Sequence, residues 1–344
     1  MSGSSGRGAA APILLGIDGG NTKTLALASA PDGTILGVSR VVRGSDIHSV
    51  PLETALAVYD DAVGQALAGI DVVTPEDVTV AASLAGADWP EDVALLEAHL
   101  RERWRSTTVV NDAIGALRGA VPDGPAVVVV TGTGTATGAR GRDGRTWHSG
   151  FWQEVQGAHE LGVRAIQAIV RAELGIDPPT RLTAAVVAAA GEHDVGAVLH
   201  RLSRRRVATD GARWDPAVLA PVLLGLADDG DPTAGAIVDR HGRALGAMAL
   251  AAARQVGIGP DDPFDLALTG GVLRRHRGRL RAALLGEVER GARRVRVVEP
   301  AAEPVVGALL LAFDAAGIPT DAAIVDRIRA GAREVEAPSA LEPR

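Results

Sequence analysis

The sequence contains no cysteine and very few aromatic residues, and both absences narrow what the protein can be. Without cysteine there is no disulfide, no thiolate metal ligand, no cysteine nucleophile and no cysteine-bound iron–sulfur cluster. Aromatic residues make up 3% of the 344 residues, whereas hydrophobic residues make up 47%. We therefore expect folded cores built from small aliphatic side chains rather than a disordered chain.

Strong positive charge and long apolar runs are also missing. The net charge is −7, and the one basic cluster, Arg201 to Arg206, has no interleaved aromatic residues, so we predict no nucleic-acid partner. No uninterrupted apolar run is long enough to span a bilayer, and the first residues lack a signal-peptide core, so we expect no membrane partner and a cytoplasmic location. Residues 1–11, rich in Ser and Gly, should form a flexible N-terminal segment.

The stretch from Leu14 to Thr24 contains the first candidate binding turn. A short apolar run predicts a buried strand, the chain breaks at Asp18, and a second strand starts at Thr24, so the two should form a hairpin. Paired glycines permit positive φ, which would let the turn amides face one anion, and hydroxyl and ammonium groups follow them. The residues predicted to bind phosphate are Gly19, Gly20, Asn21, Thr22 and Lys23, with a further hydroxyl from Thr24.

Asp18 directly precedes this turn. A carboxylate beside bound phosphate makes sense when a cation lies between them, and Mg²⁺ with its retained waters fits, so Asp18 is the candidate metal ligand. The alternative is an ordinary hairpin without a ligand, because turns containing Asp-Gly or Asn are common.

The order of predicted elements indicates two similar α/β domains. Three strands come first, and alternating helices and strands follow, which implies parallel neighbours in a mixed sheet. The pattern restarts after Ala120 with the β-branched run 126–130, so we place the domain boundary there. Residues 318–344 should form one more helix and a polar tail.

A second Gly/Thr turn follows the strand 126–130. It resembles the first turn in its position after an apolar strand, so a matched pair of turns could hold one polyphosphate. It is neither a Walker A loop nor a dinucleotide fingerprint, because the Gly-Lys-Ser/Thr ending is missing and both turns lead into strands. The candidate ATP-binding residues here are Thr131, Gly132, Thr133 and Gly134.

Asp112 stands at the end of a predicted strand and could accept a proton from a substrate hydroxyl that attacks a γ-phosphate. Its alternative role is the N-cap of the next helix, a common use of Asp. Gly270 and Gly271, between a strand and a helix, would let a flat ring approach the backbone, or they form a plain tight turn.

In this order, the segments resemble the actin/hexokinase superfamily of sugar kinases and ATPases, and within it the BadF/BadG/BcrA/BcrD ATPase family, which includes N-acetylglucosamine kinases. The similarity runs from about Ile13 to Ala316. The segments that carry it are 15–24, 84–87, 110–113, 130–135, 268–272 and 304–312. Each segment alone is weak, whereas the ordered set is specific.

The resemblance implies two ribonuclease-H-like (actin-like ATPase) domains with a cleft between them that holds ATP and Mg²⁺. The domains would be residues 12–119, joined by a returning helix at 304–317, and residues 120–303. Asp112 would be the general base, Asp18 the outer-sphere magnesium anchor, and Gly270 and Gly271 part of the adenosine site. We further expect a homodimer.

The chain departs from the family pattern where the sugar pocket is expected. Family kinases usually carry Gly-Gly-Trp-Gly and Gly-Asp-Glu-Gly-Ser here, whereas this chain has its own sequence from Ser149 to Gly162. Glu154 and Asp46 could each add a carboxylate for an amino sugar, or both could be surface residues. His159 and Glu160 could be a metal pair, but without a third ligand we favour a helix surface. The predicted substrate contacts are Asp46, Asn111, Asp112, Trp152 and Glu154.

These features predict an ATP-dependent kinase that phosphorylates a hydroxyl of an amino sugar, such as N-acetylglucosamine or a related hexosamine. Two alternatives remain: an ATPase that drives a redox partner, disfavoured by the absence of cysteine, and a non-catalytic sugar or nucleotide sensor, suggested by the altered segment after the second turn.

Overall fold

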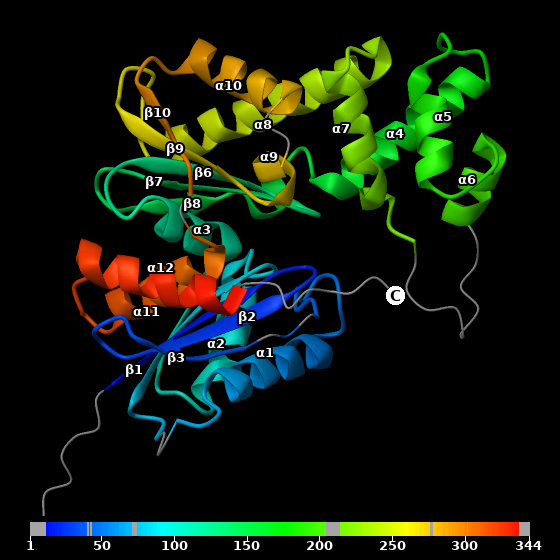
Figure 1. Cartoon of the computed structure of the whole chain (residues 1–344). Helices are drawn as coiled ribbons and strands as arrows, with labels where there is room; N and C mark the ends of the chain where they lie inside the picture. Colours follow the sequence, from blue (N-terminus) through cyan, green and yellow to red (C-terminus); the bar gives the residue numbers. More distant parts are fainter. Residues whose placement is uncertain are drawn as a thin grey trace, which may run out of the picture. The chain divides into compact units, whose positions relative to one another are not determined.

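A computed structural model describes residues 12–336 except 40, 42, 71–73, 204–213, 276–277 and 301. The predicted flexible segment 1–11, half of the basic cluster and the polar tail from residue 337 lie outside the described residues. The chain divides into two compact units, which Figure 1 shows. The first contains the chain up to Asp123 and again from Pro300, and the second is Gly124–Glu299.

The first unit is built on a five-stranded mixed sheet with the order β3-β2-β1-β4-β5. Its strands are β1 (Ile13–Gly19), β2 (Thr24–Ser29), β3 (Ile35–Val38), β4 (Val78–Leu84) and β5 (Ser106–Asn111). The first three form an antiparallel meander, and β4 lies parallel to both β1 and β5. The carboxyl ends of β1, β4 and β5 therefore meet at one edge of the sheet.

Helices cover both faces of this sheet. They are α1 (Leu52–Ala66), α2 (Pro90–Arg101), α3 (Asp112–Ala120), α11 (Pro304–Ala315) and α12 (Ala322–Glu336). Because side chains alternate along a strand, Leu15 and Ile17 of β1 join the core beneath α1 and α2, whereas Leu14 joins the core formed with α11 and α12. The returning C-terminal helices thus complete one of the two cores of the first unit.

The second unit repeats the sheet pattern, with the order β10-β9-β6-β7-β8. Its strands are β6 (Ala126–Thr131), β7 (Thr135–Arg140), β8 (Thr146–His148), β9 (Phe264–Thr269) and β10 (Val295–Val298). Its helices are α4 (Ala158–Glu173), α5 (Arg181–Ala189), α6 (Val195–Ser203), α7 (Ala220–Asp228), α8 (Pro232–Gln255), α9 (Gly271–Arg275) and α10 (Arg279–Gly291), with short 3₁₀ turns at Gly150–Trp152 and Pro216–Leu219.

The predicted α/β fold is confirmed, since each unit opens with an antiparallel hairpin and continues with parallel strands. Some element ends differ from what the sequence pattern suggests. An apolar pattern could carry the strand from Ile35 to Val41 and the helix from Pro90 to Trp104, but they end at Val38 and Arg101. Leu52 is 39% exposed because it lies at the first turn of α1.

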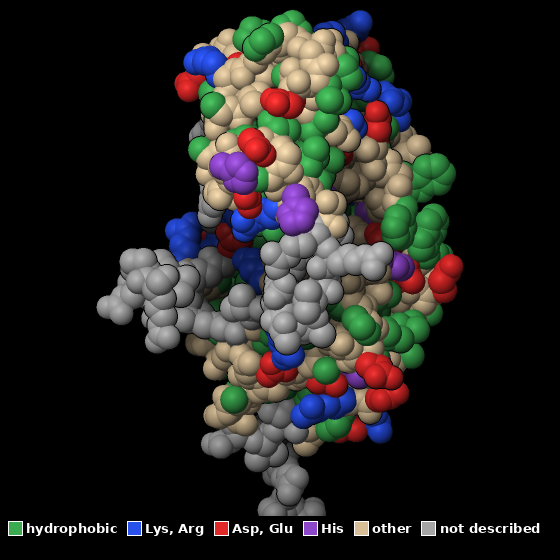
Figure 2. Space-filling view, turned by 90° about the vertical axis from the view of Figure 1, so that its right-hand side faces the viewer, with side chains coloured by type: hydrophobic (Ala, Val, Ile, Leu, Met, Phe, Trp, Pro, Cys, Tyr) green, Lys and Arg blue, Asp and Glu red, His purple; other side chains and the backbone are tan. Residues whose placement is uncertain are grey.

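Charged side chains of both signs are interspersed on the face shown in Figure 2. The ion pairs of the described residues include Arg279 with Asp239 at 2.7 Å. Exposed pairs of this kind contribute little to stability, so the apolar cores hold each unit together. No helix in the described part of the chain is both long enough and apolar enough to cross a bilayer.

Candidate functional site

The turn after β1 is shaped by close packing rather than by unusual backbone angles. Glycine permits positive φ at Gly19 and Gly20, but neither residue adopts it. Gly19 is instead required for space: an added Cβ would lie 2.7 Å from the hydroxyl oxygen of Ser45 and 2.8 Å from a methyl group of Leu84. The strand end is therefore pressed against β4 and the loop that contains Ser45.

One backbone amide of this turn donates a hydrogen bond within the protein, and three others meet no acceptor among the described residues. The Gly20 N–H donates to the Lys23 carbonyl at 3.0 Å and closes the turn. Within the described residues, the N–H groups of Asn21, Thr22 and Lys23 meet no acceptor, and these three residues are exposed. Thr24 is not an additional donor as expected, since its buried hydroxyl bonds inside the protein.

Asp18 lies at the end of β1, in register with Ser83 of β4, and is partly buried. Across the described ranges, no group of three or more His, Asp or Glu side chains is arranged to hold a metal ion. A magnesium ion is commonly bound by one or two carboxylates together with waters and substrate phosphates. The carboxylate of Asp18 beside available turn amides fits that mode of binding.

Asn111, rather than Asp112, caps α3. The side-chain oxygen of Asn111 accepts a hydrogen bond from the Ala113 N–H at 3.0 Å, and its amide group donates to Asp88 at 2.9 Å. The alternative that Asp112 is the cap is therefore wrong. Asp112 is the first residue of α3, so its carboxylate is not needed to begin the helix.

Three carboxylates gather at the carboxyl edge of the first sheet. Burial, assisted by the nearby charges of Asp88 and Asp46, raises the pKa of Asp112 to about 7. Burial also raises the pKa of Asp88, opposed by His48 and assisted by Asp46. The site therefore carries concentrated negative charge and will favour a ligand that brings hydrogen-bond donors.

The loop between β3 and α1 connects these carboxylates with the first turn. Asp46 accepts hydrogen bonds from the His48 N–H at 2.9 Å and from the Ser49 hydroxyl at 2.6 Å. The same hydroxyl oxygen lies 3.0 Å from the side-chain oxygen of Asn21. The structure thus brings together the predicted residues Asn21, Asp46, Asn111 and Asp112 within the first unit.

Asp88 belongs to this group and was missed by the sequence reasoning. Its position before Trp89 and Pro90 suggested part of a helix cap. The capping carboxylate is instead that of Asp92, which accepts from the Trp89 N–H at 3.0 Å. The available signal was that Asp88 shortly follows β4, whose carboxyl end lies beside those of β1 and β5.

In the second turn, the carbonyl groups and the N–H groups have different surroundings. Its carbonyl groups bind the start of α4, since Gly132 and Thr133 accept from the Ala158 and His159 N–H groups at 2.8 and 3.2 Å. An added Cβ at Gly157 would lie 2.2 Å from the Gly132 oxygen. In the part of the chain that the structure describes, the N–H groups of Thr133 and Gly134 have no acceptor.

Thr131 and Gly270 meet at the base of this turn. Gly270 has φ +89°, and an added Cβ would lie 2.3 Å from the Thr131 oxygen, so only glycine fits there. The hydroxyl of Thr131 is buried and has no partner among the described residues. Gly271, by contrast, has open space where a Cβ would stand. The structure therefore brings the predicted residues Thr131, Gly132, Thr133, Gly134 and Gly270 together in the second unit.

The altered segment from Ser149 to Gly162 presents its predicted contacts to the surface. The side chains of Trp152 and Glu154 are both exposed, Trp152 by 70%. Between them, Gln153 is buried and accepts a hydrogen bond from the Thr137 hydroxyl at 3.0 Å. Gln153 was not singled out by the sequence, because a Gln between exposed residues gives no sign of burial.

His159 and Glu160 do not form a metal pair. His159 pairs with Asp215 at 2.8 Å, and Glu160 bonds Arg164 at 2.9 Å and the Gln156 N–H at 2.7 Å. The interpretation as a helix surface is therefore the right one.

Comparisons with known proteins identify a family and several relatives. A model of the BadF/BadG/BcrA/BcrD ATPase family matches residues 15–312. An N-acetylmuramic acid/N-acetylglucosamine kinase from Clostridium acetobutylicum is 30% identical over 165 residues, which are 46% of this chain and 53% of that protein. The N-acetyl-D-glucosamine kinase of Dictyostelium discoideum is 25% identical over 327 residues, covering 88% of this chain and 98% of that protein.

Solved structures share the fold. One from Chromobacterium violaceum, whose description proposes an N-acetylglucosamine kinase, has a TM-score of 0.65 at 25% identity and covers 88% of this chain and 99% of its own. A ROK family glucokinase from Streptomyces griseus, solved with glucose and AMPPNP, has a TM-score of 0.56 at 18% identity with the same coverage. Since the family match runs from β1 to α11 and includes both turns and Asp112, this chain belongs to the BadF/BadG/BcrA/BcrD ATPase family.

Proposed function

We propose that this protein is an ATP-dependent kinase that phosphorylates a hydroxyl group of an amino sugar, with N-acetylglucosamine as the first candidate. The observation that carries the proposal is Asp112, a carboxylate directly after β5 with a pKa of about 7. The Dictyostelium discoideum relative, named N-acetyl-D-glucosamine kinase, supports the substrate class, since it matches along nearly its whole length.

Asp112 is the proposed general base. A base works best when its pKa lies near the working pH, because it is then both ionised in part and able to hold a proton. As the sugar oxygen bonds to the γ-phosphorus of ATP, its proton passes to the Asp112 carboxylate. The bond from the γ-phosphorus to the bridging oxygen breaks, and ADP leaves.

The other carboxylates are proposed to hold the sugar. Asp46 and Asp88 can accept hydrogen bonds from hydroxyl groups, and a sugar supplies several such donors. Asn111 positions Asp88 through its 2.9 Å hydrogen bond. Contacts of the sugar with Trp152 and Glu154 stay predictions.

Both turns are proposed to bind ATP. The amides at 21–23 and 133–134, which meet no acceptor among the described residues, are suited to phosphate oxygens, and Lys23 adds a positive charge. Glycine at 270 and 271 keeps the backbone open for adenosine. Mg²⁺ held near Asp18 would neutralise phosphate charge when bound. The predicted homodimer and cytoplasmic location stay predictions.

Release of ADP, measured against a panel of hexoses, hexosamines and N-acetylhexosamines, tests the function. We expect release that depends on an amino sugar. Asp112→Asn should lower that rate by about 10²–10⁴-fold, the usual contribution of a general base, and leave ATP binding intact. Asp60→Asn, an exposed carboxylate on α1, is the matched control and should keep full activity.

Other outcomes would replace the proposal. Release of ADP without any sugar would favour an ATPase, and ATP binding without release would favour a sensor. Full activity of Asp112→Asn would remove Asp112 from the mechanism.

A further inference from the structure

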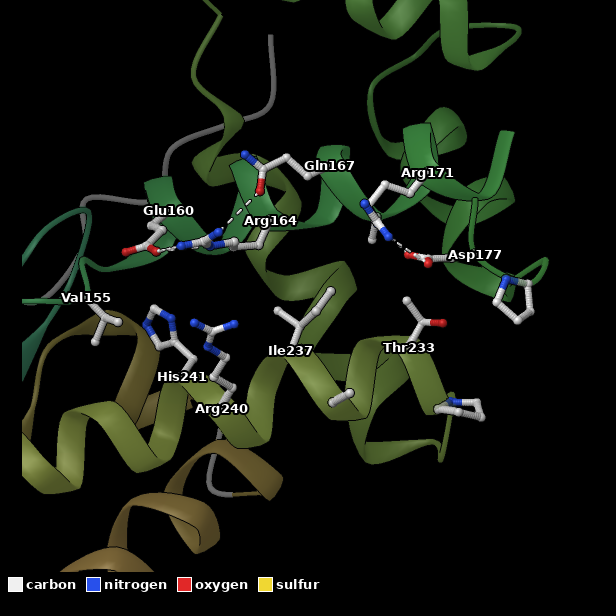
Figure 3. A pocket seen from close by; sticks show the side chains of 14 residues that line it. Val155, Glu160, Arg164, Gln167, Arg171, Asp177, Thr233, Ile237, Arg240 and His241 are labelled. Carbon is white, nitrogen blue, oxygen red and sulfur yellow. Dashed lines mark hydrogen bonds and ion pairs between the residues drawn. The ribbon is translucent and has the colours of Figure 1, made fainter. Parts of the chain in front are cut away.

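A pocket in the second unit contains none of the residues assigned above to ATP or sugar. It is a hollow of about 480 Å³ between α4 and α8, within the size range of small-molecule sites. Figure 3 shows the side chains of both helices projecting into it, with Arg240 and His241 at the end near Val155 and Glu160.

One cation in this pocket has no partner among the residues that the structure describes. Arg164 bonds Glu160 at 2.9 Å, and Arg171 bonds Asp177 at 2.6 Å. Arg240 also lines the pocket, and no ion pair or hydrogen bond engages it within the described ranges. Figure 3 marks none between Arg240 and the other residues drawn. Three guanidinium groups against two carboxylates give the pocket a net positive charge. A guanidinium without a carboxylate is well suited to an oxyanion.

His241 supplies the second, independent observation. Its side chain lines the pocket and is only 4% exposed, and its Nε2 atom is buried without a hydrogen-bond partner among the described residues. In the tautomer that carries its proton on the other ring nitrogen, Nε2 has a lone pair that can accept a hydrogen bond from a donor such as a hydroxyl. Burial lowers the pKa of His241, which keeps the ring neutral.

Apolar side chains line part of the pocket as well. Among them are Ala236 and Ile237 of α8 and Ala168 of α4. Such a surface suits the carbon skeleton of a small molecule rather than a bare inorganic ion. A ligand that matches the guanidinium, the acceptor nitrogen and the apolar wall would carry an oxyanion, a hydroxyl group and a carbon skeleton.

We propose that this pocket is an effector site for a small polyol that carries an oxyanion, the chemistry shared by sugar phosphates and sugar acids. The guanidinium of Arg240 binds the oxyanion, and Nε2 of His241 accepts a hydrogen bond from a hydroxyl. The proposal does not depend on the kinase function, because none of the assigned ATP or sugar residues takes part.

Isothermal titration of the full chain tests the site. The ligands are glucose 6-phosphate, gluconate, glucose and inorganic phosphate. We expect glucose 6-phosphate or gluconate to bind at least tenfold more tightly than glucose or inorganic phosphate. Whichever binds more tightly identifies the oxyanion as phosphate or carboxylate. Equal affinity for all four ligands, or no binding at millimolar concentration, would overturn the proposal.

Variants separate this pocket from the proposed active site. Arg240→Gln should weaken the binding at least tenfold. Arg243→Gln, an exposed arginine one turn along the same helix, should leave it unchanged, and so should Asp112→Asn. His241→Phe keeps a ring in place and should reduce the affinity for glucose 6-phosphate to that for inorganic phosphate. The proposal would be contradicted if N-acetylglucosamine competed with the bound ligand and Arg240→Gln bound that ligand as tightly as the parent does.

Discussion

Asp112 shows how its surroundings adapt a single carboxylate. Its side chain is partly buried beside Asp88 and Asp46, so its pKa rises from the ordinary 3.8 to about 7. The neighbour Asn111 takes over the capping of α3, which leaves Asp112 available for chemistry. Both effects arise from residues that are either adjacent in sequence or brought together by the sheet.

The raised pKa of Asp112 makes the folded state sensitive to pH. Because the folded protein holds this proton more tightly than the unfolded chain, this group's contribution to stability is present below pH 4 and is lost as the pH rises to about 7. Asp112→Asn should therefore have a higher Tm than the parent at pH 8, by roughly 2–4 °C for each 1 kcal/mol recovered. At pH 4 the two Tm values should nearly agree. A lower Tm of the variant at pH 8 would show that the buried charge is not costly.

Asp88 should control the pH at which Asp112 works. Its negative charge is the second largest cause of the raised pKa of Asp112, after burial. Asp88→Asn should lower that pKa, so the rising limb of the pH–rate profile should move to lower pH. Asp92→Asn is the control, because this carboxylate does not appear among the causes of the shift. If both variants retain the parental profile, Asp88 has no electrostatic influence on the base.

At the scale of elements, the crossing of α3 and α11 positions the end of β5. The two helices approach so closely that an added Cβ at Gly307 would lie 1.8 Å from the carbonyl oxygen of Gly115. A similar closeness holds between β1 and α11, since a Cβ at Gly16 would lie 2.2 Å from the Leu309 nitrogen. These contacts exclude any larger residue without a shift of backbone.

Gly307→Ala should therefore destabilise the first unit by about 1–3 kcal/mol, the usual cost of overpacking. The matched control is Gly64→Ala in α1, where no atom lies within 4 Å of an added Cβ. That substitution should stabilise the protein by up to about 1 kcal/mol, because alanine favours helix more than glycine does. Urea unfolding of both variants measures the difference. Stabilisation by Gly307→Ala would show that the crossing is looser than the structure has it.

At the scale of the whole molecule, one unit is formed by a single chain segment and the other by two. The second is the single segment Gly124–Glu299, whereas the first needs residues from both ends of the chain. Leu309, Leu310 and Phe313 of α11 fill the core on one face of the first sheet. Without them, that face would expose a contiguous apolar surface.

A chain that ends after Glu299 should therefore fail to fold its first unit, whereas residues 124–299 alone should fold. Circular dichroism and thermal unfolding of the two shortened chains measure this directly. We expect one cooperative transition for 124–299. If the chain that ends after Glu299 shows a second cooperative transition, its first unit folds without α11, which would contradict the role of that helix.

Much of the fold followed from local patterns. The hairpin at Asp18, the strand 126–130 and the helix near 304 were predicted because alternation, turn residues and helical periodicity are properties of neighbouring residues. The ordered set of short segments was also enough to indicate the family. Errors arose at element ends, where periodicity stops being informative.

The arrangement of the candidate site was harder to predict from the sequence than the fold was. The sequence by itself determined which turns are rich in glycine and where carboxylates follow strands. It could not show that Asp88 lies beside Asp112, that Asn111 is the cap, or that Gly19 is required for space instead of positive φ. Only the folded chain decided these points, because charge interaction, burial and steric contact depend on residues that the sheet and the helix crossings bring together from distant positions.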